Sequence, residues 1–121
     1  NLLFLSGVGP RKRNSKTIPG VSLNRAGEII DYSIHEQCVA VFENVRLVLK
    51  DSGANWGDII DVTVFLTNMQ DDFEVFNELY KSYFSDPFPT RTTVEVNSLP
   101  TPIAIELKVV AYINKNKNHV S

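Results

Sequence analysis

Two apolar stripes at helical spacing, separated by a run of β-branched residues, constrain the fold of this chain most. A capping-box pair, Ser33 with Glu36, precedes the first stripe, and Gly53 follows it. The second stripe ends before Pro87. Between them, residues 58–67 ("DIIDVTVFLT") predict a buried strand. The two stripes are formed by Cys38, Val41, Phe42, Val45, Val48 and Leu49, and by Phe73, Phe76, Leu79, Tyr80, Tyr83 and Phe84.

Short strands flank this helix–strand–helix unit. We expect them at 2–7, 91–96 and 103–113, with a weaker one around 29–32 and a long loop or pair of turns over 8–29. One face of the last strand is apolar throughout, whereas the other mixes Ala, Val and Tyr with Glu106 and Lys108. The order of elements predicts an α+β sandwich with both helices on one sheet face. Burial against other subunits is one explanation of the mixed face.

Length and composition indicate one domain and favour neither nucleic acid nor a membrane as a partner. The 121 residues suit one domain, which we expect at 1–113, followed by a loose polar tail at 114–121. A net charge of −2 argues against attraction to nucleic acid, and the apolar runs are shorter than the roughly 20 residues of a membrane span. The single cysteine, Cys38, excludes an intrachain disulfide and favours a reducing compartment. Because the chain opens in what reads as a strand, we expect residues to precede Asn1.

Arg91 and Glu106 are the residues that chemistry could use. Arg91 follows two prolines at the mouth of a strand. It is either a solvated arginine or a clamp for a carboxylate, which a guanidinium matches in bidentate geometry. Glu106 stands in mid-strand, where a carboxylate must be exposed or paired. It is either a surface glutamate of an edge strand or a group that orients water and relays a proton.

Other polar groups carry weaker signals. The cluster Arg11, Lys12 and Arg13 is typical of a solvated loop, and Cys38 of a buried thiol. His35 lies near a helix start and His119 in the tail, and two histidines without a nearby cluster of ligands argue against a metal site. Nucleophile-elbow, P-loop and Rossmann glycine patterns are absent from the sequence, as is an aromatic–basic stripe for nucleic acid.

Three stretches together resemble the RidA (YjgF) family of enamine and imine deaminases. They are "LLFLSG", "DIIDVTVFLTNMQDDFEVFNELYKSYF", and "FPTRTTVEVNSLP" followed by "IAIELKVVAYI". The resemblance covers nearly the whole chain apart from residues 8–32 and the tail. It implies a chorismate-mutase-like fold, assembled as a homotrimer around a central β-barrel, with sites between subunits and no cofactor or metal. A cytoplasmic location is expected.

The resemblance also implies residue roles. Arg91 matches the arginine that grips the substrate carboxylate, and Glu106 the glutamate that positions the attacking water. Gly7 matches a glycine whose backbone lines the site, and Asn77 a helix asparagine near it. Thr93 stands where many members carry cysteine or serine, so its backbone could serve but a thiol role is lost. The tyrosine motif at the family's N-terminus is not seen, because the chain starts after it.

The substrate stays open between two classes of acid. The loop "SGVGPRKRNSKTIPGV" departs from the shorter stretch of the generic 2-iminobutanoate/2-iminopropanoate deaminases and looks more like the branch of 2-aminomuconate deaminase. In that branch Arg11, Lys12 or Arg13 could hold a second carboxylate. The resemblance leaves two alternatives to catalysis on imines. One is an endoribonuclease or translation inhibitor, and the other is a non-catalytic metabolite-binding or chaperone-like trimer.

Overall fold

A computed structural model describes residues 1–114 of the chain. The predicted tail at 114–121 therefore lies outside the described residues except for Asn114, and so does His119.

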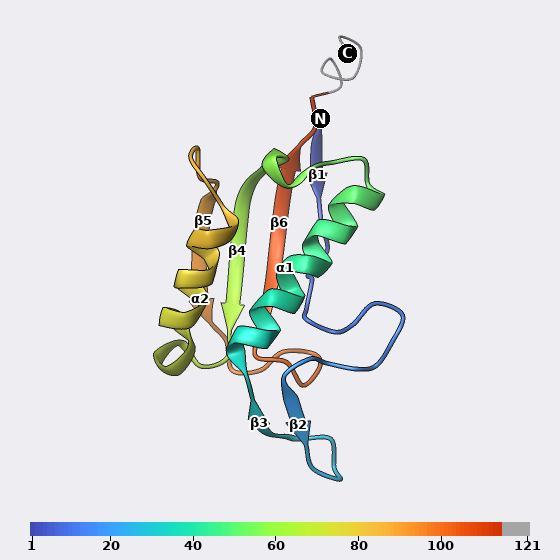
Figure 1. The fold of residues 1–121 in the computed structure, drawn as a ribbon, viewed down its shortest axis with the longest axis vertical. Coiled ribbons are helices and arrows are strands. Elements are labelled where there is room, and N and C mark those ends of the chain that lie inside the picture. The colour runs from blue at the N-terminus through green and yellow to red at the C-terminus, as the bar shows by residue number, and fades with distance from the viewer. Residues whose placement is uncertain (115–121) are drawn as a thin grey trace.

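Four strands form one mixed sheet in the order β1-β6-β4-β5. Their bounds are Leu2–Phe4 for β1, Ile105–Tyr112 for β6, Ile59–Leu66 for β4 and Thr90–Glu95 for β5. The pairs β1–β6 and β6–β4 are antiparallel, whereas β4 and β5 run parallel and are joined by a helical crossover (Figure 1). The mixed sheet of an α+β fold is thus confirmed, and β5 is one of its two edges.

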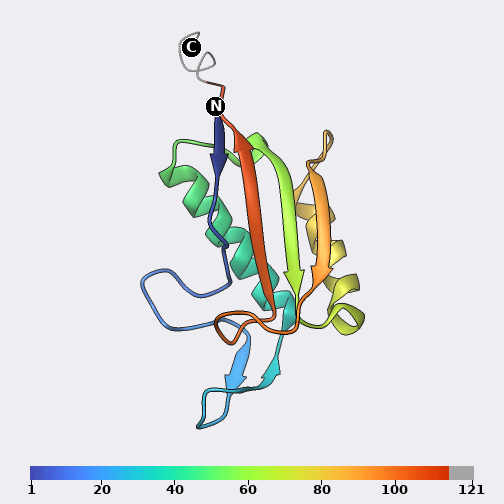
Figure 2. The same cartoon turned by 180° about the vertical axis from the view of Figure 1, so that it is seen from behind.

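Two helices cover the same face of the sheet, as predicted. They are α1 at Ile34–Asp51 and α2 at Met69–Tyr83, and a short 3₁₀ turn at Trp56–Asp58 precedes β4. The Ser33 hydroxyl accepts the Glu36 N–H at 3.2 Å, and the Asn68 side chain accepts the Asp71 N–H at 3.1 Å. Figure 2, seen from behind, shows the opposite face of the sheet without a helix over it.

The core lies between the helices and the sheet. It contains the predicted stripe of α1, much of the stripe of α2 and alternate residues of β4 and β6. Complete burial of such a large apolar side chain contributes roughly 1.5–3 kcal/mol. Cys38 has 0% exposure within this core. Burial, with a smaller contribution from the Asp72 charge, raises the pKa of its thiol to about 12, so the cysteine is structural.

The predicted loop over 8–29 is wrong at its C-terminal end, where a strand lies. Residues Val21–Leu23 form β2, which pairs antiparallel with β3 at Ile29–Tyr32. The turn is built locally, because the Asn24 side chain accepts the N–H groups of Ala26 and Glu28. Three residues, of which Ser22 and Leu23 are exposed, are too few to display alternation. Only the pairing with β3, itself weakly predicted, defines this strand.

Candidate functional site

Arg91 lies between β5 and α2, not in solvent. Its Nη1 donates a hydrogen bond to Asn77 Oδ1 at 2.9 Å, which brings together two of the predicted site residues. Three aromatic rings of α2 surround the guanidinium carbon, at 4.7 Å for Tyr80, 5.5 Å for Phe76 and 5.8 Å for Phe73. The side chain is half-buried. The solvated interpretation of Arg91 is therefore wrong.

The positive charge of Arg91 has no carboxylate partner within residues 1–114. The ion pairs recorded there join Arg13 to Asp51, Arg46 to Glu43 and Lys81 to Glu78. A partly desolvated guanidinium that bonds one neutral amide oxygen keeps most of its donors for another acceptor. The geometry around Arg91 thus suits an external anion.

Two further polar atoms stand near Arg91 without a partner. Thr93 lies two residues along β5, on the same side of the strand, and its Oγ1 is buried. The hydroxyl of Tyr80, whose ring contacts Arg91, is buried too. In the part of the chain that the structure describes, neither atom makes a hydrogen bond. Burial raises the pKa of Tyr80, which the Arg91 charge lowers in part, so the phenol is neutral.

Glu106 lies on the other face of the sheet. It alternates with Ile105 and Leu107, which are buried under the helices, and it pairs with Phe65 of the neighbouring strand β4. Its carboxylate touches Gly7, because a Cβ built on Gly7 would stand 2.6 Å from Glu106 Oε2. A larger residue at this position would displace the Glu106 carboxylate. Two more predicted site residues are thus in contact with each other.

A bulge creates the contact between Gly7 and Glu106. Phe4 pairs with Val110, but Val8 pairs with Leu107, so the N-terminal segment holds one extra residue. Val8 exchanges both backbone hydrogen bonds with Leu107, at 2.8 and 2.9 Å. The extra residue falls beside Glu106, and the backbone of Gly7 is exposed there.

One chain does not bring the two candidate catalytic residues together. Arg91 faces the helices from edge strand β5, whereas Glu106 faces away from them on β6, and β4 lies between the two strands. A hollow of about 810 Å³ over α2 is lined by His35, Phe73 and Asn77 among others, but by neither Arg91 nor Glu106. The Arg91–Asn77 half and the Gly7–Glu106 half are separate in the monomer.

The basic loop lies beside the Gly7–Glu106 half. Gly7, Arg11 and Lys12 help to line a hollow of about 290 Å³, whose floor includes Asn44 of α1. The Asn44 amide donates to the carbonyl oxygens of Gly9 and Arg11, at 2.8 and 2.7 Å. These bonds hold the loop backbone against the helix while the Arg11 side chain stays exposed.

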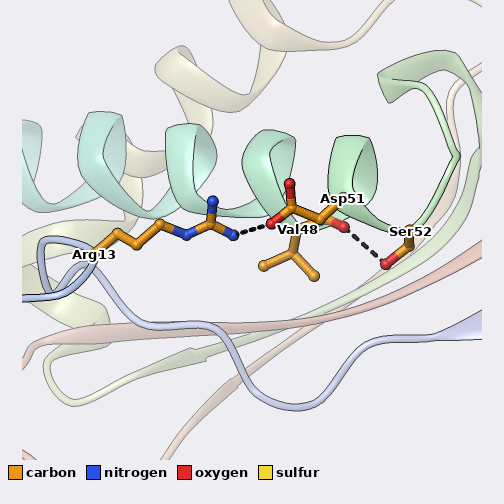
Figure 3. A network of polar contacts seen from close by, with 4 residues as sticks. All are labelled: Arg13, Val48, Asp51 and Ser52. Atoms are coloured by element: carbon orange, nitrogen blue, oxygen red, sulfur yellow. Dashed lines mark hydrogen bonds and ion pairs between the residues drawn. The ribbon is translucent and has the colours of Figure 1, made fainter.

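Arg13 borders the same hollow, but its guanidinium is already bound at the C-terminal end of α1. Its guanidinium donates to the carboxylate of Asp51, next to the Ser52 hydroxyl that bonds the Val48 carbonyl at 2.8 Å (Figure 3). Of the three basic residues of the loop, Arg11 and Lys12 therefore remain as cations that could meet a ligand.

Sequence reasoning missed the aromatic surroundings of Arg91 and the anchoring role of Asn44. Phe73, Phe76 and Tyr80 were predicted only as core residues, although Asn77 on the same face of α2 signals a polar contact there. Within residues 1–114, no group of three or more His, Cys, Asp or Glu side chains is placed to hold a metal ion. In the same range, neither helix combines the length and apolar character that a membrane crossing needs.

Comparisons with known proteins agree on one family. The sequence profile of the Endoribonuclease L-PSP family matches residues 1–113. A RutC family protein of Pyrococcus horikoshii is 40% identical over 112 residues, which span 93% of this chain and 79% of that protein. A protein of Dermatophagoides farinae named 2-iminobutanoate/2-iminopropanoate deaminase is 33% identical over 89 residues. These span 74% of this chain and 69% of that protein.

A solved structure agrees as well. The crystal structure of RidA from the Antarctic bacterium Psychrobacter superposes with a TM-score of 0.77 at 26% identity, covering 93% of this chain and 81% of that one. The chain shares its fold with RidA and matches the family profile along all but its last residues, and it belongs to the Endoribonuclease L-PSP (RidA) family.

Proposed function

We propose that this protein is a hydrolytic deaminase of enamine and imine carboxylates. The observation that carries the proposal is Arg91, a half-buried guanidinium with no carboxylate partner among residues 1–114. A substrate carboxylate would complete it through paired N–H···O bonds. The deaminase name of the Dermatophagoides relative supports the same chemistry.

The proposed reaction needs positioning and one group that transfers protons. The enamine tautomerises to an imine, water adds to the imine carbon, and the C–N bond then breaks to release ammonia and leave a 2-oxo acid. Arg91 holds the carboxylate, and the Gly7 backbone and Glu106 orient the attacking water. Glu106 accepts a proton from this water and returns it to the nitrogen that leaves as ammonia. No electrons are gained or lost, so the reaction calls for no redox cofactor.

The site is proposed to form between subunits of a homotrimer. The separation of the Arg91 half from the Gly7–Glu106 half supports this, because the proposed reaction needs both halves at one substrate. The first half would come from one subunit, with Asn77 and Thr93, and the second from its neighbour. We place the enzyme in the cytoplasm, in line with its single buried thiol.

We propose 2-aminomuconate as the substrate class, with small 2-imino acids as the alternative. 2-Aminomuconate carries a carboxylate at each end, and Arg91 can hold one of them. Arg11 borders the hollow next to Gly7 and has no ion-pair partner among the described residues, so it is the better candidate for the far carboxylate. Arg13, already bound to Asp51, is not.

The test compares ammonia release from 2-aminomuconate and from 2-iminobutanoate, each generated in situ. Arg91→Ala and Glu106→Ala should lose turnover of both substrates by at least about 100-fold. Arg11→Ala should raise KM for 2-aminomuconate only, by about tenfold, since it removes one charge-assisted contact. Arg13→Ala serves as the matched control. It should change KM for 2-aminomuconate, relative to 2-iminobutanoate, less than Arg11→Ala does.

Three outcomes would contradict these assignments. Equal losses on both substrates in Arg11→Ala would exclude the second-carboxylate role. RNA cleavage that persists in pure Arg91→Ala protein would favour the endoribonuclease alternative, which the family name motivates. Binding of 2-oxo acids without turnover of either imine would favour a non-catalytic metabolite-binding or chaperone-like trimer.

A further inference from the structure

The surroundings of Arg91 hold its guanidinium in place without occupying most of its donors. A carboxylate that fixed such an arginine would take the forked N–H groups for itself, because arginine–carboxylate pairs are frequently bidentate. Here one amide oxygen, that of Asn77, accepts a single N–H at 2.9 Å. The other contacts of Arg91 found among residues 1–114 are aromatic. A π-face attracts the cation without accepting its N–H groups in the plane of the fork.

Tyr80 is the main contact of this kind. Its ring centroid lies 4.7 Å from the guanidinium carbon, closer than those of Phe76 and Phe73. The ring is also held within the core, because Tyr80 stacks on Phe84 at 4.3 Å between centroids. A ring that is held by the core in this way can itself fix the plane of the guanidinium.

We infer that Tyr80 and Asn77 are positioning residues, which fix the plane of Arg91 and leave its donors open for a carboxylate. This inference deepens the proposed function, on which it rests for the identity of the substrate. Phe73 and Phe76 complete the aromatic surroundings, and with Tyr80 they occupy one face of α2 at spacings of three and four residues.

The first test separates the aromatic face from the hydroxyl of Tyr80. Binding of 2-oxobutanoate, a product of imine hydrolysis, is measured by calorimetry beside KM and kcat for 2-iminobutanoate. Tyr80→Leu should weaken binding and raise KM by about two- to thirtyfold, the range of a cation–π contact, with a much smaller change in kcat. Tyr80→Phe keeps the π-face and should restore most of the affinity, since the hydroxyl has no hydrogen-bond partner among the described residues.

Phe42→Leu is the control for a general loss of packing. Phe42 is fully buried on α1 and contacts the same aromatic core, but its recorded contacts do not include Arg91. It should lower the thermal stability at least as much as Tyr80→Leu while leaving KM near the wild-type value. If Phe42→Leu raises KM equally, the effect of Tyr80 is merely structural and the inference fails.

The second test replaces Asn77 by a competing carboxylate. Asn77→Asp changes the side chain little in shape and adds an ion pair with Arg91. If Asn77 had only a structural role, the variant should keep or gain stability and should bind 2-oxobutanoate as the wild type does. The inference demands the opposite for binding: affinity for 2-oxobutanoate should fall by at least about tenfold, because the aspartate occupies the donors. Unchanged affinity in Asn77→Asp would overturn it.

The outcomes distinguish this inference from the proposed function. If the wild type releases no ammonia but binds 2-oxobutanoate in a way that needs Arg91 and Tyr80, the deaminase proposal fails and the inference stands. If Arg91→Ala abolishes activity while Tyr80→Leu and Asn77→Asp keep wild-type KM and affinity, the deaminase stands and the inference fails.

Discussion

At the scale of single residues, Gly7 is the position whose substitution would act most directly on Glu106. An added Cβ would meet Oε2 of Glu106 at 2.6 Å and its Cδ at 2.9 Å, distances that real Cβ atoms do not show. The obstacle is the end of a flexible side chain, so the fold can yield by moving the carboxylate. A methyl group added at Gly7 should therefore displace the Glu106 carboxylate while leaving the core almost unchanged.

Gly7→Ala should consequently lower kcat by about 100-fold, the effect of an ångström-scale displacement, with only a small fall in melting temperature. Steady-state kinetics and thermal unfolding measure the two. Gly57→Ala is the matched control, because a Cβ there has no heavy atom within 4 Å and should leave both values unchanged. If the Gly7 variant keeps wild-type kcat, the carboxylate does not need its observed position.

At the scale of elements, two polar contacts, one part-buried and one buried, join parts of the fold that are distant in the sequence. The Tyr32 hydroxyl at the end of β3 donates to Asp72 Oδ2 of α2 at 2.7 Å, which ties the β2–β3 hairpin to the helix. Gln37 of α1 accepts the Ala104 N–H at 2.8 Å, two residues before Glu106. These bonds determine where the ends of the elements lie.

The Asp72 contact predicts a dependence of stability on pH. Asp72 is 4% exposed; burial raises the pKa of its carboxyl, the Tyr32 hydroxyl lowers it in part, and Asp71 raises it again. A raised folded-state pKa means that the folded protein binds the proton more tightly than the unfolded chain. Stability from this group is therefore greatest below the unfolded pKa of about 3.9 and falls as pH rises through the folded pKa.

Asp72→Asn removes this titration and keeps an oxygen that can accept the Tyr32 hydroxyl. The free energy of unfolding of the variant, relative to the wild type, should rise between about pH 3 and pH 7, as urea titrations at several pH values would show. Tyr32→Phe, which removes the bond that stabilises the carboxylate, should make the wild-type trend steeper. A difference that is constant with pH would show that Asp72 does not titrate as proposed.

At the scale of the whole molecule, the uncovered face of the sheet is the main feature (Figure 2). Its strand pairing gathers Leu2 and Phe4 beside Val110 and Tyr112, and three of these four are at least 49% exposed. Apolar side chains gathered on one sheet face are typical of a surface that another molecule covers. A trimer that buries this face would also let the Arg91 half meet a neighbour's Gly7–Glu106 half.

Phe4→Lys tests the trimer. The wild type should have about three times the chain mass of 13.6 kDa by light scattering, and the variant should approach the mass of one chain and lose activity. Ile30→Lys is the control, since Ile30 is 66% exposed on the hairpin and Phe4 is 64% exposed on the sheet. A wild type with the mass of one chain, or a trimeric Phe4→Lys protein, would contradict this use of the face.

Much of the fold follows from the sequence because the dominant forces there are local and periodic. Helical spacing, the Ser33 cap and the β-branched run of β4 each specify an element within about 20 residues of chain, and burial of their apolar sides leaves little choice of layer. The short strand β2 was missed because no local pattern specifies it: it is defined by its pairing with β3.

The resemblance of motifs singled out Arg91 and Glu106, but their environments depend on contacts between distant residues. Sequence alone gave no means to see that Arg91 lies against three rings of α2, or that one extra residue before Val8 brings Gly7 against Glu106. The faces on which the two residues lie follow from strand register, and a shift of one residue reverses every side chain. The sequence by itself determined the elements and the chemical groups, whereas only the tertiary structure decided which groups meet, because register and packing are set by the whole chain.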